Sequence, residues 1–253
     1  MQHDAARDPA HFGQAFDDPA VPRWLEQAAP TALAAASRYW RTIVGGGHLS
    51  PRMKELVLVA LHGSVTALDS EALRRHIGRA IAAGASPQDV LDVLTSIVGV
   101  ANHALYSAVP ILLDALRDAG HPDAELPPAT AQAEAAKADF IRTRGFWNEQ
   151  RDALARLMPE YFGALSEVSM QPWKDGVLSA RERELIYIAI DCGPTHGYGP
   201  GLALHIRHAL GHGATRDEIL EVFQLAALTG LEGFILGAQA LAAFPLATGS
   251  TGT

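Results

Sequence analysis

The chain contains an internal repeat. Shifting its 253 residues by 129 positions lays it on itself without a gap, so that LSPRMKELVLVALHG (49–63) matches LSARERELIYIAIDC (178–192). Residues 73–94 match residues 202–223 in the same register. One structural unit is therefore written twice, which limits the fold to two similar halves. The identical pairs include Ser50/Ser179, Arg52/Arg181, Glu55/Glu184, His76/His205 and Gly84/Gly213.

Capping residues mark where helices begin and end. Ser50 followed by Pro51 is typical of a helix N-terminus, and Ser179 with Glu182 three residues later has the pattern of a capping box. The segments that start at Ser86 and Thr215 repeat this signature, and the glycine just before each one favours the left-handed end of a helix. These marks predict helices at about 51–62, 70–83 and 87–105, and again at 180–191, 200–212 and 216–229.

The first helix of each unit is expected to lie at the centre of the fold. Residues 57–61 and 186–190 are apolar on all sides, as a helix buried all round should be. Their Val, Ile and Tyr residues would also suit a strand, but the caps and the 3.6-residue spacing of neighbouring segments favour helix.

These patterns predict an all-α chain with five segments. We expect a flexible N-terminal arm (1–20), a first unit (21–118), a linker and connecting helix (119–145), a second unit (146–246) and a disordered tail (247–253). Because the link is short and both units present matching helix faces, the units should pack as a pseudo-symmetric pair. Further assembly into a homo-oligomer is also expected.

Composition limits the partners of this chain. It is 48% hydrophobic with a net charge of −8, and it has no Lys/Arg-rich run, so nucleic acid is not an expected partner. Its apolar stretches are broken before about 18 residues, and its start lacks the pattern of a signal peptide, so we expect no membrane partner and a cytoplasmic location. The single cysteine, Cys192, excludes an internal disulfide and any metal site with two thiolates.

The motifs of both units resemble those of the carboxymuconolactone decarboxylase family, whose fold the alkylhydroperoxidase AhpD-like proteins share. The resemblance lies in an R-E-L helix, a His-containing helix and a Gly-Ala-[ST] turn that leads into a further helix, and it implies a tandem pair of AhpD-like units. In the second unit it is carried by Arg183-Glu184-Leu185, His205, Gly213-Ala214-Thr215, Glu218-Ile219, Glu221-Val222 and Gly230. In the first unit it is carried by Lys54-Glu55-Leu56, His76, Gly84-Ala85-Ser86, Asp89-Val90 and Gly99.

The resemblance implies decarboxylase or thiol peroxidase chemistry. The peroxidase branch uses a Cys-x-x-Cys shortly before the family histidine, and the matching places here fall near Tyr198 and Gly201 and near Asp69 and Ala72. None of these is cysteine, and disulfide-based peroxide reduction needs two thiols. This chemistry is therefore disfavoured.

His205 and Glu184 are the leading catalytic candidates. An imidazole held by a carboxylate from the preceding helix could donate and accept protons near neutral pH. The alternative is a structural hydrogen bond that joins the two helices. His76 and Glu55 form the equivalent second pseudo-site in the first unit, with less chemistry around them.

The loop at 191–201 adds further candidates. Its glycines can bring backbone N–H groups close to a ligand, and it carries Cys192, His196 and Tyr198. We expect His196 to take part in catalysis, and Tyr198 and Cys192 to bind substrate, although each could instead stabilise the loop or the core. The equivalent loop of the first unit is plainer, so the second unit is expected to hold the active site.

Three more residues are candidate substrate ligands. Arg181 could bind a substrate carboxylate or form a surface ion pair. His103 and Glu232 are equivalent in the repeat and could line a pocket or form a polar contact between units. No cofactor is implied and no metal is predicted, although His62, His103, His196 and His205 could gather around one.

The sequence therefore predicts a cofactor-free lyase that acts on a small cyclic carboxylate or lactone by histidine general acid/base catalysis, with a small molecule as its partner. Two alternatives stay open at this point. One is an AhpD-like alkyl hydroperoxide peroxidase, and the other is a non-catalytic helical scaffold or binding protein.

Overall fold

The computed structural model describes residues 10–244, and within that range it contains helices and no strand, which confirms the all-α prediction. The first half contains η1 (Phe12–Ala15), α1 (Ala20–Ala28), α2 (Pro30–Val44), α3 (Pro51–Gly63), α4 (Ser70–Ala82), α5 (Pro87–Ser96), η2 (Ile97–Ala101) and α6 (Asn102–Asp118). The second half contains η3 (Pro122–Ala124), α7 (Ala131–Arg144), α8 (Glu149–Leu157), α9 (Pro159–Asp175), α10 (Ala180–Asp191), α11 (Gly199–Gly211), α12 (Arg216–Leu228), η4 (Thr229–Leu231) and α13 (Glu232–Ala242).

The predicted capping chemistry fixes the helix starts. The Ser179 side chain accepts a hydrogen bond from the Glu182 N–H, and the capping boxes of Ser86 with Asp89 and Thr215 with Glu218 are formed. Gly84 and Gly213 adopt the left-handed conformation, with φ of +93° and +85°. One prediction is wrong, because the helix expected at 87–105 ends at Ser96, and its continuation through η2 is a 3₁₀ turn.

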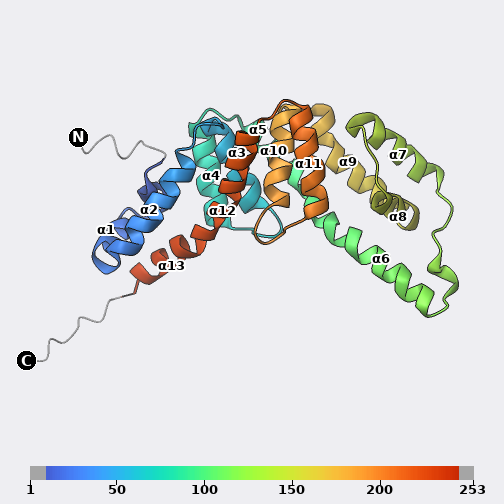
Figure 1. Ribbon diagram of the computed structural model, residues 1–253, viewed down its shortest axis with the longest axis horizontal. Coiled ribbons are helices and arrows are strands. Elements are labelled where there is room, and N and C mark those ends of the chain that lie inside the picture. The colour runs from blue at the N-terminus through green and yellow to red at the C-terminus, as the bar shows by residue number, and fades with distance from the viewer. Residues whose placement is uncertain (1–9, 245–253) are drawn as a thin grey trace, which may run out of the picture.

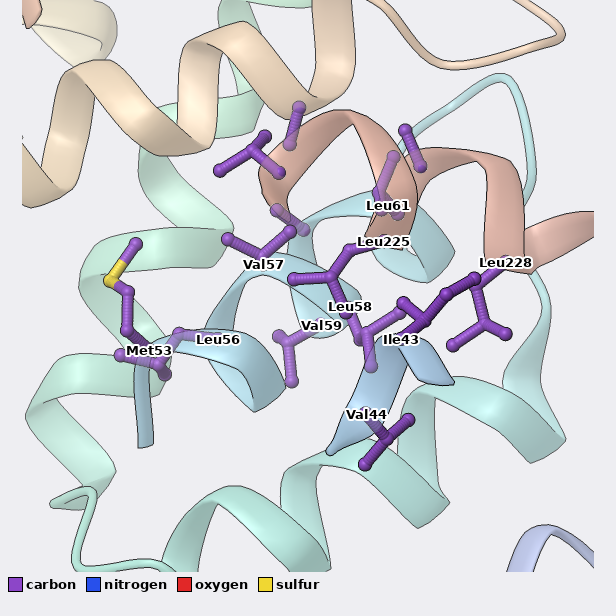
Figure 2. Packing of buried hydrophobic residues seen from close by; sticks show 14 of the residues in the cluster. Ile43, Val44, Met53, Leu56, Val57, Leu58, Val59, Leu61, Leu225 and Leu228 are labelled. Atoms are coloured by element: carbon purple, nitrogen blue, oxygen red, sulfur yellow. The ribbon is translucent and has the colours of Figure 1, made fainter. Parts of the chain in front are cut away.

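The two central helices form the middle of the core. Leu56, Val57 and Val59 of α3 are fully buried, as are Leu185, Ile186 and Ile188 of α10. Figure 2 shows the side chains of α3 surrounded by those of α2 and α12. Because residues on every side of α3 and α10 lie against other helices, their uniformly apolar sequence stabilises the fold without an exposed face.

Two ion pairs related by the repeat join the units. Lys54 of the first unit pairs with Glu221 of the second (3.0 Å), and Arg183 of the second pairs with Asp92 of the first. Both pairs are buried. Glu221 also accepts a hydrogen bond from the Leu49 N–H, just before α3, and Asp92 accepts one from the Leu178 N–H, just before α10. The units therefore pack as the predicted pseudo-symmetric pair.

Replacing Arg183 with methionine should lower the free energy of unfolding by about 3–5 kcal/mol, because it leaves the Asp92 carboxylate buried without its charged partner. Chemical denaturation of the purified variant measures this loss. The double variant Arg183→Met/Asp92→Leu should recover most of it. A double variant no more stable than Arg183→Met would show that the pair is not the cause.

The last helix of each unit packs on the opposite unit. In Figure 1, α6 extends from the first unit toward α8, and α13 extends from the second unit toward α1. His103, at the start of α6, therefore reaches the second-unit site, and Glu232, at the start of α13, reaches the first-unit site.

The predicted flexible arm is wrong for part of its length. Phe12, Ala15 and Phe16 are buried in the core, and α1 begins at Ala20. Phe12 packs against Trp40 and Phe234. The free energy gained by burying these apolar side chains exceeds the conformational entropy lost when the segment is ordered. Residues 1–9 of the arm and the whole of the predicted tail (247–253) lie outside the described residues.

Two helical stretches, Pro87–Asp118 and Arg216–Ala242, are long and apolar enough by length and composition to cross a membrane. Each is interrupted by a 3₁₀ turn, and each supplies buried core residues such as Val93 and Leu225. Core helices pass the same test of length and composition, and the expectation of no membrane partner stays a prediction.

Candidate active site

The structure brings His205 and Glu184 together. His205 on α11 lies with its Nδ1 at 2.6 Å from Oε2 of Glu184 on α10. The carboxylate is 1% exposed, and its other oxygen faces the Arg144 guanidinium at 3.5 Å and His208 Nδ1 at 3.6 Å. The hydrogen bond at Nδ1 leaves Nε2 of His205 free to exchange a proton.

The surroundings of this pair shift the pKa of both His205 and Glu184. Burial lowers the pKa of His205, although Glu184 opposes the shift. Burial opposes ionisation of Glu184, but the hydrogen bond with His205 and the charge of Arg144 hold its pKa below the usual value. The pair thus combines an ionised carboxylate with an imidazole that is neutral at rest, a state that can accept a proton.

A small cavity lies beside His205 and is lined by both units. Tyr187 and Asp191 of α10 form one wall, and Ser169 of α9 another. The first unit contributes Ser96, Gly99, Val100, Asn102, His103 and Tyr106, and the second unit also contributes Phe140, Arg144, Arg151, Phe162, Leu165, Ser166, Ile190 and His205. The cavity therefore depends on the extension of α6 across the molecule.

Two arginines line this cavity, and neither was among the predicted site residues. Arg144 packs against Trp173, with its guanidinium carbon 4.1 Å from the ring centre, and Arg151 packs in the same way against Phe140 at 4.2 Å. Arg151 has no acidic partner among the described residues, and burial lowers its pKa. Arg151 is partly buried, and its buried Nε has no hydrogen-bond partner among the described residues, so the guanidinium could bind an anionic ligand in the cavity.

Asp191 is the other unpredicted residue. It is 1% exposed, and neither carboxylate oxygen has a hydrogen-bond partner in the described part of the chain. Burial raises its pKa to about 8, and the negative charge of Glu184 contributes. The nitrogens of three imidazoles lie near its oxygens, those of His103 at 3.6 Å and of His196 and His205 at 3.9 Å each.

Three of the predicted residues lie together at this end of the cavity. Nδ1 of His103 lies 2.7 Å from Nε2 of His196, and the Tyr198 ring stacks on His103 with centroids 3.9 Å apart. Burial lowers the pKa of His103 to about 3 and also lowers that of His196, so both rings are neutral near pH 7. His196 and Tyr198 thus shape the site through His103.

Three other predicted ligands lie away from the cavity. Arg181 is tied to Glu218 in an ion pair. Both carboxylate oxygens of Glu232 accept hydrogen bonds from Arg75 in the first-unit site, at 2.6 and 2.7 Å, because α13 crosses to that unit. The Cys192 thiol donates to the Ala189 carbonyl, and burial raises its pKa to about 12, so it is not a nucleophile at neutral pH. None of the three lines the cavity beside His205, so substrate binding by them stays a prediction without support there.

The first-unit pseudo-site repeats the pair, and the cavity described near it is lined by His62 and Glu232 and not by His76. Nδ1 of His76 lies 2.7 Å from Oε2 of Glu55, whose other oxygen pairs with Arg79 at 2.8 Å. Trp40 lies beside His76 with ring centroids 6.5 Å apart and is 1% exposed. Its indole occupies the position that Ser169 holds in the second unit, 129 residues later.

The chemistry of the two sites differs at the equivalent positions. Arg144 and Arg151 correspond to Ala15 and Pro22, and Tyr187 corresponds to Leu58. The arginines of the first-unit site, Arg75 and Arg79, pair with Glu232 and Glu55, so Arg151 of the second unit is the better candidate to bind an anion.

Among the described residues, three groups have side chains close enough to share a metal ion. They are His103, Asp191 and His196, then Glu184, His205 and His208, and finally His62, His76 and Glu232. In the last two groups each carboxylate already pairs with a guanidinium, that of Arg144 or Arg75. The first group alone contains a carboxylate with no partner.

The fold and this site define the class of protein. A sequence profile of the carboxymuconolactone decarboxylase family matches residues 30–119 and 159–248, two ranges that are themselves 129 residues apart, so the chain belongs to this family. It is similar to a protein of Burkholderia xenovorans LB400, whose crystal structure is described as that of a proposed gamma-carboxymuconolactone decarboxylase subunit. That structure has 32% identity and a TM-score of 0.84, and the alignment covers 96% of this chain and 98% of that one. The comparison with curated proteins gives no match.

Proposed function

We propose that the second-unit cavity decarboxylates a small cyclic carboxylate or lactone. The observation that carries this proposal is Arg151, a partly buried guanidinium that lines the cavity with no acidic partner among the described residues. A substrate carboxylate would supply the missing negative charge. Membership of the family and the similarity to a proposed decarboxylase subunit support the same reaction.

His205 is the proton-transfer residue in this proposal. Loss of CO2 breaks the bond between a ring carbon and its carboxylate, and the electron pair moves into the conjugated carbonyl as an enolate. The neutral His205 ring takes up a proton from solvent at Nε2, and the imidazolium that results donates this proton to the enolate carbon, which returns the ring to its neutral state. Glu184 holds the ring by Nδ1 and stabilises its charged form, while Arg144 or Arg151 faces the anionic oxygen.

The alternatives find less support in the structure. The peroxidase needs a thiolate and a second thiol, whereas Cys192 is the single cysteine and its pKa is raised to about 12. A scaffold would fill the space around the histidine with apolar side chains. Trp40 does so around His76, but arginine, tyrosine and serine side chains line the cavity beside His205.

The direct test is turnover of carboxymuconolactone by the purified chain, followed by CO2 release. Placing tryptophan at Ser169 copies Trp40 into the active unit and should reduce turnover more than about 100-fold by occluding the cavity. The reverse change, Trp40→Ser, should leave turnover intact and lower the free energy of unfolding by about 3–5 kcal/mol. Full activity in a folded Ser169→Trp variant would place the reaction elsewhere.

A further inference from the structure

Asp191 is a buried carboxylate that the proposed reaction does not use. Its oxygens accept no hydrogen bond from any described residue, and neither Arg144 nor Arg151 comes within ion-pair distance of it. An ionised carboxylate without a partner is costly to bury, which is why the pKa of Asp191 is raised, and a cation bound beside it would stabilise the ionised form.

The equivalent positions of the first unit show how a buried carboxylate is paired there. Asp191 and His103 are equivalent to His62 and Glu232, so each site has one carboxylate and one imidazole at these two positions. In the first unit, Arg75 binds both oxygens of Glu232. The residue equivalent to Arg75 in the second unit is Leu204, so the built-in cation is missing there.

The second unit has an extra imidazole instead. His196 replaces Ala67 of the first unit, and its Nε2 lies 2.7 Å from Nδ1 of His103 and 3.9 Å from Oδ1 of Asp191. Nδ1 of His103 lies 3.6 Å from the same oxygen. These three atoms lie on a circle with a radius of about 2.0 Å, which is the length of a Zn²⁺ bond to an imidazole nitrogen or a carboxylate oxygen.

We propose that His103 Nδ1, His196 Nε2 and Asp191 bind a divalent transition-metal ion of the Zn²⁺ type. Two imidazoles and one carboxylate are a ligand set typical of catalytic metal sites with an open position. The ion replaces the contact between the two imidazoles with two metal bonds and neutralises Asp191. Nε2 of His205, 3.9 Å from Oδ2, faces the open side, where a ligand in the cavity would meet the ion.

Metal binding is measured without any substrate, so this inference is independent of the proposed decarboxylation. The full-length chain is stripped with EDTA, dialysed and titrated with ZnCl2 by isothermal calorimetry, and with Co²⁺ by visible absorption. We expect one Zn²⁺ per chain with a Kd below about 1 μM. Co²⁺ should give the absorption bands of a nitrogen- and oxygen-ligated ion.

Variants separate this site from other histidines. Asp191→Asn and His196→Gln should each weaken Zn²⁺ binding at least about 100-fold, with helix content checked by circular dichroism. His62→Gln, in the equivalent first-unit cluster, and His212→Gln, on the surface, should leave stoichiometry and affinity unchanged. No binding of Zn²⁺ or Co²⁺ by the folded chain, or equal binding by Asp191→Asn, would overturn the proposal.

Discussion

Replacing Arg151 with methionine should reduce kcat/KM for carboxymuconolactone about 1,000-fold, corresponding to about 4 kcal/mol of transition-state stabilisation. Methionine keeps the packing against Phe140 but removes the charge that the substrate carboxylate would meet. The free energy of unfolding should stay the same or rise, because a partly buried charge without an acidic partner is removed. Steady-state kinetics and chemical denaturation of the same preparation measure both effects.

The matched control is Arg181→Met. Arg181 pairs with Glu218 outside the cavity, so its loss should change kcat/KM less than about twofold. Loss of activity in both variants would indicate a general effect of positive charge on substrate attraction. An active Arg151→Met enzyme would remove the main support for a carboxylate-binding cavity.

Replacing His205 with glutamine should lower kcat by about 10²–10⁴-fold while KM changes little, because the variant binds substrate but lacks the proton-transfer group. The side chain is partly buried, and its hydrogen bond to Glu184 can be kept by the glutamine amide. Helix content should therefore be unchanged. Rapid-quench measurement of CO2 release shows whether the chemical step is the one that slows.

His76→Gln tests the same pair in the first unit. His76 is fully buried against Trp40 and bonded to Glu55, so its replacement should lower stability and leave kcat intact. If both histidine variants lost activity equally, the His–Glu pair would be a structural link in both units and not a catalytic one.

Much of the fold follows from local chemistry that sequence alone displays. Caps such as Ser179 with Glu182 depend on side chains three residues apart, so their partners are visible in the sequence. The all-round apolar pattern of α3 likewise predicts a central helix. The end of α5 at Ser96 was not predicted, because its apolar pattern continues through the 3₁₀ turn into α6.

The candidate site was only partly predictable. His205 and Glu184 stand out because both survive in each copy, and the structure brings them together. Arg144, Arg151 and Asp191 gave no such signal, since they differ from Ala15, Pro22 and His62 in the other copy. Identity between the halves therefore marks the proton-transfer pair, and differences between the halves mark the residues that would bind the substrate carboxylate.

Glu232 forms a polar contact between the units, which was one of the two roles that the sequence left open for it. Position within a unit does not reveal which unit a terminal helix contacts, because that choice depends on packing between segments more than a hundred residues apart. The ion pair with Arg75 shows the answer directly.

The crossing of α6 and α13 affects how the two halves could diverge. Each half completes its neighbour's site, so either half produced by itself would lack a wall and could assemble only with a second polypeptide. Two identical polypeptides joined in this way would carry the same substitution twice. Because the two halves are covalently linked in one chain, each half can change by itself. Trp40 can therefore lie beside the histidine of the first unit while the second unit carries Arg144, Arg151 and Asp191.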